Sequence, residues 1–231
     1  AVERLETVHQ RLGWESKAGE SPLTRQLRGQ VLGALGTLGN EPSIVTRARD
    51  HYARYKEDPA SVDADVIAAC VSVIAAAGNQ ADYDEFWQQF KTARTPQEER
   101  RFMNSLAGFR DGTLLGRALG HALDGEVRTQ DAPFLVAMVF YNPEGGRLAW
   151  QYACDHWDEM LQKYPDNTLI RIAEGVTALN TPELADEAEV FFKEHPIAGA
   201  GKRLDQILER QRINVDFRGR EAKNAAAYFT G

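Results

Sequence analysis

The segment that decides the fold is NPEGGRLAWQYACDHWDEMLQKY, residues 142–164. Asn142-Pro143 and Gly145-Gly146 predict a loop, because proline restricts the residue before it and each glycine would cost about 1 kcal/mol inside a helix. From Arg147 onward, apolar residues recur at spacings of three and four, which predicts one amphipathic helix. This apolar stripe consists of Trp150, Cys154, Trp157, Leu161 and Tyr164. A helix anchored by large aromatic side chains needs other helices to pack against.

The rest of the chain repeats this organisation. Proline often opens an apolar run with helical spacing, and glycine or an Asp-Pro pair ends it, which predicts roughly a dozen helices of about 10 to 18 residues. The predicted helices cover residues 2–12, 22–38, 42–57, 62–77, 83–90, 95–106, 114–122, 134–141, 147–164, 169–179, 181–192, 204–215 and 222–229. The unbroken apolar run 134–141 could also be a buried strand, but its helical surroundings favour a helix. Thr95 and Glu98 are spaced for a capping box.

Short connections between helices predict an all-α fold. Neighbouring helices joined in this way run antiparallel, and many similar hairpins stack most naturally into a curved solenoid of the HEAT or armadillo kind, an α-α superhelix. No exact repeat unit is present, so any repeats are structural and degenerate. We expect residues 1–231 to form one helical-repeat domain.

Composition indicates a globular protein. Of its 231 residues, 43% are hydrophobic and 26% are charged, without the long apolar run that a membrane span requires. The net charge of −7 argues against a broad face for binding nucleic acid, which depends on lysine and arginine. The two cysteines, Cys70 and Cys154, are expected to be buried, reduced thiols, and this favours a cytoplasmic location. The chain opens with Ala1-Val2-Glu3, already in helical register, which suggests a fragment of a longer chain.

No pattern of catalytic or metal-binding residues is found. A zinc helix needs two histidines four residues apart with a glutamate after the first, and none of the five histidines meets this spacing. His156, beside Asp155 and one turn before Glu159, comes nearest, yet an ordinary surface or half-buried histidine is favoured. Nucleophile elbows and phosphate-binding glycine loops are missing as well. We therefore expect no catalytic residue and no metal ligand on this chain.

Several stretches, taken in order, resemble a known family. They are Arg11-Leu12-Gly13-Trp14 with the leucine-rich segment up to Gly39, Arg128-Thr129-Gln130-Asp131, the glycine loop followed by Ala149-Trp150 and Trp157-Asp158-Glu159, and EAEVFFKEHP at 187–196. Together they resemble the C-terminal helical domain of zinc aminopeptidases of the aminopeptidase N superfamily, with the puromycin-sensitive aminopeptidase branch as the nearest.

The resemblance implies a non-catalytic domain. Family members carry a substrate-binding Gly-x-Met-Glu-Asn and a zinc-binding His-Glu-x-x-His on an earlier catalytic domain, and neither motif occurs here. The zinc would belong to the parent enzyme's catalytic domain, and this domain's partners would be that catalytic domain and the peptide substrate. In the family, the helical domain forms a bowl that encloses the cavity before the zinc and limits which peptides are admitted.

Three residues are candidates for the inner surface of such a bowl. Arg147 follows the glycine loop and Arg171 lies on the next predicted helix, and arginine suits a peptide's terminal carboxylate. Tyr141 stands where the branch that trims antigenic peptides has a basic residue, and could offer its hydroxyl or its ring. The alternative for both arginines is a solvated side chain that covers an aromatic stripe. The alternative for the whole chain is a free-standing solenoid scaffold that binds a protein partner.

Overall fold

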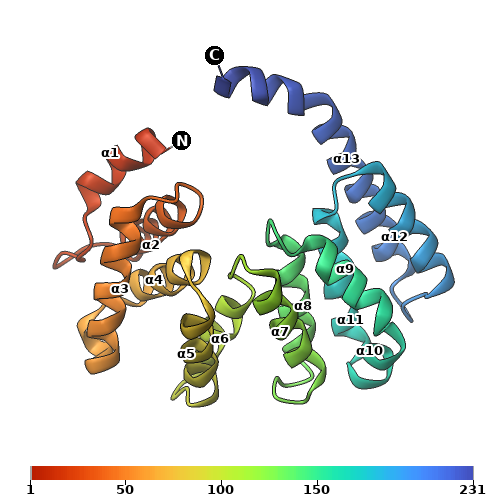
Figure 1. Cartoon of the computed structure of the whole chain (residues 1–231), viewed down its shortest axis with the longest axis horizontal. Helices are drawn as coiled ribbons and strands as arrows, with labels where there is room; N and C mark the ends of the chain where they lie inside the picture. Colours follow the sequence, from red (N-terminus) through yellow and green to blue (C-terminus); the bar gives the residue numbers. More distant parts are fainter. Residues whose placement is uncertain (1, 231) are drawn as a thin grey trace. The chain divides into compact units, whose positions relative to one another are not determined.

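The computed structural model describes residues 2–230, which fold into helices joined by short connections (Figure 1). No strand occurs within these residues, and the predicted all-α class is confirmed. The helices are α1 (Val2–Leu12), α2 (Pro22–Thr37), α3 (Pro42–Glu57), α4 (Ala64–Ala77), α5 (Gln80–Lys91), α6 (Pro96–Leu106), α7 (Gly112–Leu123), α8 (Ala132–Tyr141), α9 (Gly146–Asp155), α10 (Trp157–Lys163), α11 (Asp166–Gly175), α12 (Pro182–Glu194) and α13 (Gly201–Thr230). Two 3₁₀ turns, η1 (Pro59–Ser61) and η2 (Val176–Ala178), follow α3 and α11.

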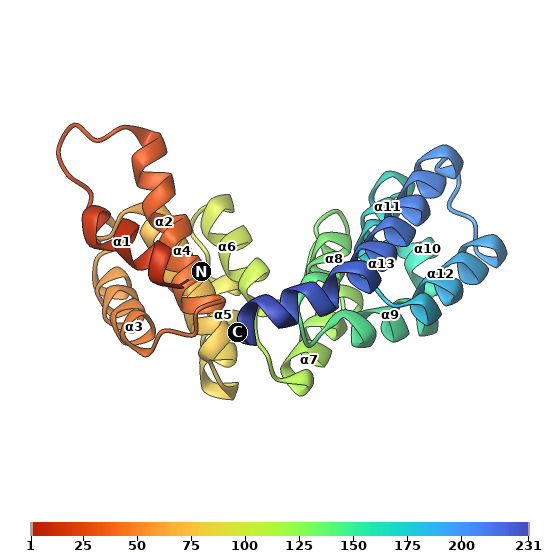
Figure 2. The same cartoon turned by 90° about the horizontal axis from the view of Figure 1, so that it is seen from above.

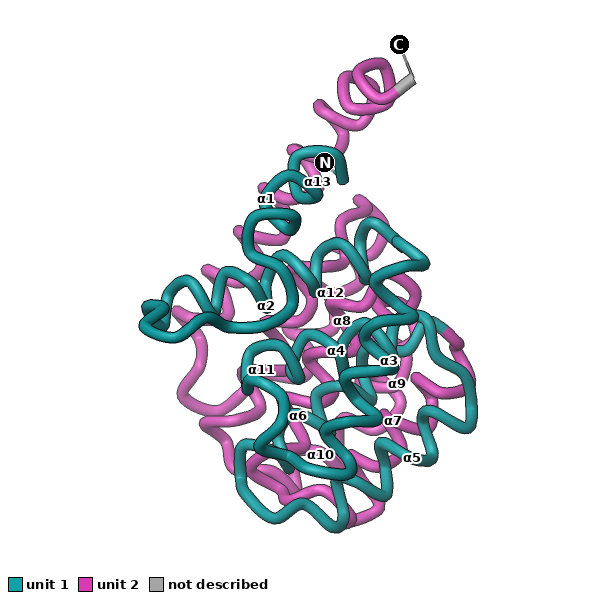
Figure 3. The backbone as a smooth tube through the Cα atoms, turned by 90° about the vertical axis from the view of Figure 1, so that its left-hand side faces the viewer, with its two compact units in different colours: residues 1–110 teal, residues 111–231 magenta. Residues whose placement is uncertain are grey.

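The chain divides into two compact units, Ala1–Arg110 and Asp111–Gly231 (Figure 3). In the first unit α4 packs against both α2 and α3, and α5 packs against α6. In the second unit α8 packs against α7, α9 and α11. Each unit is therefore a stack of helical hairpins of the solenoid-like kind that the sequence predicts. The curvature of a complete solenoid and the single domain over residues 1–231 stay predictions.

The predicted capping box at the start of α6 forms only in part. The Thr95 hydroxyl accepts the backbone N–H of Glu98 at 3.1 Å, as expected. The Glu98 carboxylate does not return to Thr95; it accepts the backbone N–H of Arg94 at 2.8 Å and the hydroxyl of Tyr55 at 2.7 Å. Because Tyr55 comes from α3, the glutamate stabilises packing between helices as well as the start of its own helix.

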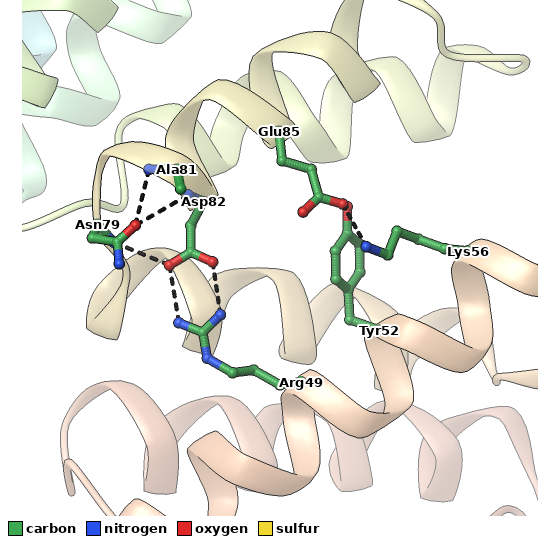
Figure 4. A network of polar contacts seen from close by, with 7 residues as sticks. All are labelled: Arg49, Tyr52, Lys56, Asn79, Ala81, Asp82 and Glu85. Atoms are coloured by element: carbon green, nitrogen blue, oxygen red, sulfur yellow. Dashed lines mark hydrogen bonds and ion pairs between the residues drawn. The ribbon is translucent and has the colours of Figure 1, made fainter.

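Polar contacts join α3 to α5 in the first unit (Figure 4). The Arg49 guanidinium donates to both oxygens of Asp82, at 2.7 and 2.9 Å, and this bonding lowers the pKa of the Asp82 carboxyl. Asp82 also closes a reciprocal capping box with Asn79 that the sequence analysis missed. One turn further along α5, Glu85 accepts the hydroxyl of Tyr52 at 3.1 Å. These bonds connect two helices whose apolar faces both contribute buried residues to the core.

Apolar residues recur at spacings of three and four in the segment that forms α2, which predicts one buried stripe of Leu23, Leu27, Val31, Leu35 and Leu38. This prediction is wrong for three of the five leucine and valine residues. Val31 and Leu35 are buried, but Leu23 is 75% exposed, Leu27 39% and Leu38 84%. The buried residues of α2 all lie between Arg28 and Gly36, so Leu23 and Leu27 before this segment and Leu38 after it are not covered. Periodicity identifies the face of a helix, but it does not show how much of that face a neighbour covers.

The central segment contains two helices where the sequence predicts one. The helix ends at Asp155, His156 has the non-helical angles φ −116° and ψ 15°, and α10 begins at Trp157. The predicted stripe survives, since Trp150 and Trp157 both pack edge-on against Phe191 of α12, with ring centroids 5.2 and 5.5 Å away. A single non-helical residue leaves the three-and-four spacing intact, so the periodic pattern passes through the break unchanged.

Of two further predictions for helices of the second unit, one is confirmed and one is wrong. Residues 134–141 are helical, as expected, and Leu135 and Val139 of α8 are fully buried. The two predicted C-terminal helices are instead the single 30-residue helix α13, because Gly219 does not interrupt it. None of the helices within residues 2–230 combines the length and the hydrophobicity that a membrane crossing requires.

Candidate functional site

The site forms where the loop after α8 turns the chain into α9. Pro143 holds Asn142 in an extended conformation, φ −71° and ψ 131°, so α8 ends at Tyr141. The Asn142 side-chain oxygen then accepts the backbone N–H of Glu144 at 2.9 Å. At Gly145 a Cβ atom would lie 2.5 Å from the Val139 carbonyl oxygen, so only glycine allows this tight a turn. Tyr141 is the last residue of α8, directly before this turn, and it is 58% exposed.

A second glycine brings α11 next to Tyr141. Phe140 lies directly on Gly175, where an added Cβ atom would come within 2.6 Å of the phenylalanine ring. Phe140 itself is 1% exposed, so its ring has no free space to move into. Because the two helices approach so closely, Glu174, which precedes Gly175, lies beside Tyr141, which follows Phe140. In Figures 1 and 2 these helices lie near α13, which contacts α11.

Hydrogen bonds organise this junction. The Tyr141 hydroxyl donates to the Glu174 backbone carbonyl at 3.1 Å, and the Thr177 hydroxyl donates to the same oxygen at 2.8 Å. The Glu174 carboxylate pairs with Arg171 at 2.9 Å and with Arg203 of α13. Partial burial alone would raise the pKa of Glu174, but the bonds from Arg203 and Arg171 outweigh it, and the net direction is downward.

An open pocket of about 380 Å³ lies at this junction, between the ends of α8 and α11 and one face of α13. It is lined by Tyr141, Glu174, Thr177, Arg203, Gln206, Ile207 and Arg210. Arg203 and Arg210 stand seven residues apart, which is close to two helical turns and puts both on one side of α13. Arg210 is exposed and has no hydrogen-bond or ion-pair partner among the residues described. The pocket therefore combines one unpaired cation with hydroxyl and amide groups.

The structure brings together two of the three residues predicted for the site. Tyr141 lines the pocket, and Arg171 touches it from outside through Glu174. The Arg171 guanidinium also lies over the exposed ring of Phe134, 5.5 Å from its centroid, so the arginine covers an aromatic residue. Arg147 is exposed in the first turn of α9 and forms no hydrogen bond or ion pair with any residue in the described range. Whether any of the three contacts a peptide stays a prediction.

Sequence reasoning missed the residues of α13. The pocket residues of α13 recur at spacings of three and four, which indicates one helix face, so the sequence does contain a signal for this surface. These residues are Arg203, Gln206, Ile207 and Arg210. In the sequence this signal is masked by the apolar Leu204, Ile207 and Leu208, which indicate the buried side of the same helix. A basic pair two turns apart becomes informative only when another element is known to face it.

The histidines and cysteines have structural surroundings. His51 is buried and stacks on Trp14 at 4.5 Å, while His156 forms an ion pair with Glu159 at 3.6 Å when protonated. Within residues 2–230 no group of three histidine, cysteine or carboxylate side chains is arranged to hold a metal ion. Cys70 is buried, as expected, but Cys154 is only half-buried. Both are unpaired, and burial raises the pKa of each thiol to about 12. Such thiols stay protonated and are poor nucleophiles.

Comparison with known proteins adds the family. The sequence model of the ERAP1-like C-terminal domain matches residues 2–213. Aminopeptidase M1-A of Oryza sativa subsp. japonica is 32% identical over 219 residues, which cover 93% of this chain and 25% of that protein. Aminopeptidase M1 of Arabidopsis thaliana is 29% identical over 214 residues (90% and 24%), and glutamyl aminopeptidase of Rattus norvegicus is 25% identical over 232 residues (98% and 24%).

The chain thus spans about a quarter of the length of the curated relatives it matches. Placement in the puromycin-sensitive branch stays a prediction, since these relatives carry other names. The match over residues 2–213 agrees with the resemblance found in the sequence, and the chain therefore belongs to the ERAP1-like C-terminal domain family of aminopeptidases.

Proposed function

We propose that this chain is the non-catalytic wall of a zinc aminopeptidase, an enzyme that removes N-terminal residues from peptides. In this proposal the helical domain encloses the substrate cavity and helps to select the peptides that reach the zinc. The observation that carries it is the family match over residues 2–213, together with relatives that are named aminopeptidases and are about four times as long. A chain covering a quarter of such a protein contributes one part of its architecture.

The proposal assigns the chemistry to the remainder of the polypeptide. The catalytic domain of the same polypeptide would hold the zinc through His-Glu-x-x-His and the peptide's N-terminus through Gly-x-Met-Glu-Asn, and neither motif stands in residues 1–231. The two unpaired thiols support a reducing compartment, and we place the enzyme in the cytoplasm. Reading the parent gene tests this assignment, because a gene without both motifs would refute it.

The candidate wall residues are tested in the full-length enzyme. Arg147→Ala removes an unpaired, exposed guanidinium, and Arg171→Ala removes one of the two arginines that hold Glu174. If these groups face the cavity, each variant raises KM for longer peptides and leaves single-residue chromogenic substrates nearly unaffected, because only a long peptide reaches the wall. Arg100→Ala on α6 is the matched control, since Arg100 is also exposed and unpaired among the residues described.

Two results would count against the anchoring role. An equal change of KM for both substrate classes would place the effect at the catalytic centre. A change as large in Arg100→Ala as in Arg147→Ala would reduce it to a general effect of charge.

A further inference from the structure

We propose that a groove between α12 and α13 binds a lysine side chain of a partner protein. The two helices contact each other and lie side by side in Figure 1. The groove measures about 320 Å³ and shares no lining residue with the pocket at the end of α8. We call it the α12–α13 groove. It is separate from the proposed function, because the two helices of this chain form all of it.

The floor of the α12–α13 groove is apolar. It is formed by Phe192, which is 3% exposed, by Leu204, which is 8% exposed, and by the half-buried Leu208. A side chain that enters the groove therefore meets apolar groups along its length. Such a surface favours a long aliphatic stem, which can cover the floor while a polar or charged end stays in water.

Both cations that line the groove are already paired. The Arg212 guanidinium pairs with Asp186 and Glu189 of α12, each at 2.7 Å, and Lys193 pairs with Glu189 at 3.0 Å. The hydrogen bonds from Arg212 and Lys193 lower the pKa of the Glu189 carboxyl, as expected for a carboxylate held by two cations. Among the residues described, the groove therefore presents no free cation that would attract an anion.

Two carboxylates at the edge of the groove are free. Asp205 and Glu209 are exposed and form no hydrogen bond or ion pair with any residue in the described range. Arg212 follows Glu209 by three residues, a spacing that permits an ion pair on a helix, but its guanidinium pairs with α12 instead. Because Asp205 and Glu209 are four residues apart, they lie on one face of α13 with Cβ atoms about 5–6 Å apart. One cation can therefore reach both.

The apolar floor and the two free carboxylates together select lysine. Its ammonium is a compact charge with three rotatable donors, so it can contact two separate carboxylates, whereas the planar guanidinium of arginine matches the two oxygens of one carboxylate. Its four-carbon stem suits the floor. The net charge of −7 also favours a basic partner, and it disfavours a second copy of the same acidic chain as the occupant.

NMR titration of the isotope-labelled 231-residue chain tests the proposal with two probes. They are lysine and norleucine, each blocked by an acetyl group and a methylamide; norleucine has the same four-carbon stem without the ammonium. The backbone amide shifts of α12 and α13 report where a probe binds. We expect the lysine probe to shift the amides around Asp205 and Glu209, and the norleucine probe to bind at least about tenfold more weakly, because it lacks the charged hydrogen bonds.

Asp205→Asn and Glu209→Gln are the decisive variants, and Asp216→Asn is their control. Each removes one exposed and, among the described residues, unpaired carboxylate from α13, but Asp216 does not line the groove. Each decisive variant should weaken binding of the lysine probe at least about threefold, and the double variant at least about tenfold, while Asp216→Asn leaves it unchanged. Equal binding of the two probes, or wild-type affinity in the double variant, would overturn the proposal.

The source of the lysine is tested by two further measurements. The lysine probe should bind the full-length enzyme as it binds the chain, because a groove that serves a partner protein stays open there. Loss of binding in the full-length enzyme would show that another part of the polypeptide fills the groove. Self-association of the chain that the lysine probe reverses, followed by sedimentation, would assign the groove to a second copy. Either result would overturn the assignment to a partner protein.

Discussion

Gly175→Ala tests how the candidate site is held together. The substitution adds one methyl group where α11 touches α8, and that carbon would lie 2.6, 2.7 and 2.9 Å from three atoms of Phe140. Because the phenylalanine is 1% exposed, relief requires the two helices to separate, and such overpacking costs about 1–3 kcal/mol. The same change would otherwise gain about 0.5–1 kcal/mol of helix propensity. Gly175→Ala is therefore expected to destabilise the protein despite replacing a helical glycine.

Gly116→Ala in α7 is the matched control. It is the same substitution in a helix of the same unit, but nothing lies within 4 Å of the added carbon. It should gain the propensity term alone. Gly175 is the last residue of α11, so its propensity gain is no larger than that of Gly116 inside α7, and the difference in free energy of unfolding should be at least about 1 kcal/mol in favour of Gly116→Ala. Thermal unfolding followed by circular dichroism should show this as a melting-temperature difference of at least about 2 °C.

A second substitution checks the cause. Phe140→Ala removes Cγ and Cδ2, the two atoms nearest the added methyl group, so in the Gly175→Ala background it should cost less than in the wild type. The two changes should therefore be coupled. Equal stability of Gly175→Ala and Gly116→Ala, or additive effects of Gly175→Ala and Phe140→Ala, would refute the close contact between α8 and α11.

Three further predictions concern stability. Arg28→Ala removes a fully buried guanidinium that lies 2.7 Å from the Glu20 carboxylate. The free energy of unfolding, measured by urea titration, should fall by about 3 kcal/mol, the lower end for a buried ion pair, because Glu20 can turn to solvent. A loss below about 1 kcal/mol would contradict this. The pKa of Glu174 is lowered from its ordinary value of 4.5, so its contribution to the stability of the fold is complete above that pH and is lost as pH falls through the folded-state pKa. On acidification, the urea midpoint of Glu174→Gln should therefore fall less steeply than that of the wild type. Parallel curves would contradict this. Trp150 donates its indole N–H to Glu187 at 3.1 Å, whereas the indole N–H of Trp157 is buried without an acceptor among the described residues. The loss in free energy of unfolding should therefore be at least about 1 kcal/mol smaller for Trp157→Phe than for Trp150→Phe. The reverse order would contradict this.

Local signals in the sequence predict the helices well. Pro22, Pro96 and Pro182 stand at the starts of α2, α6 and α12, because proline's fixed φ suits a first turn whose N–H groups have no intrahelical partner. What the local pattern misses is set by contacts between distant segments. The break at His156 and the exposure of Leu23 depend on which neighbour packs where, and periodicity carries no such information.

The candidate site shows the same limit. Tyr141 could be chosen from the sequence because it stands beside the Asn-Pro and glycine signals of its loop. Arg210 lies 69 positions further on and reaches the same pocket only because α11 brings α8 and α13 together. Arg171 could be named, but its engagement by Glu174 and Phe134 becomes visible only in three dimensions.

In the proposed function, this chain forms a wall and another part of the polypeptide hydrolyses the peptides. The most direct measurement is peptide turnover and zinc content of the purified 231-residue chain, alongside the full-length enzyme under the same conditions. We expect turnover and stoichiometric zinc in the full-length enzyme and neither in the chain alone. Turnover by the chain alone, or a zinc ion bound tightly by its own side chains, would contradict it.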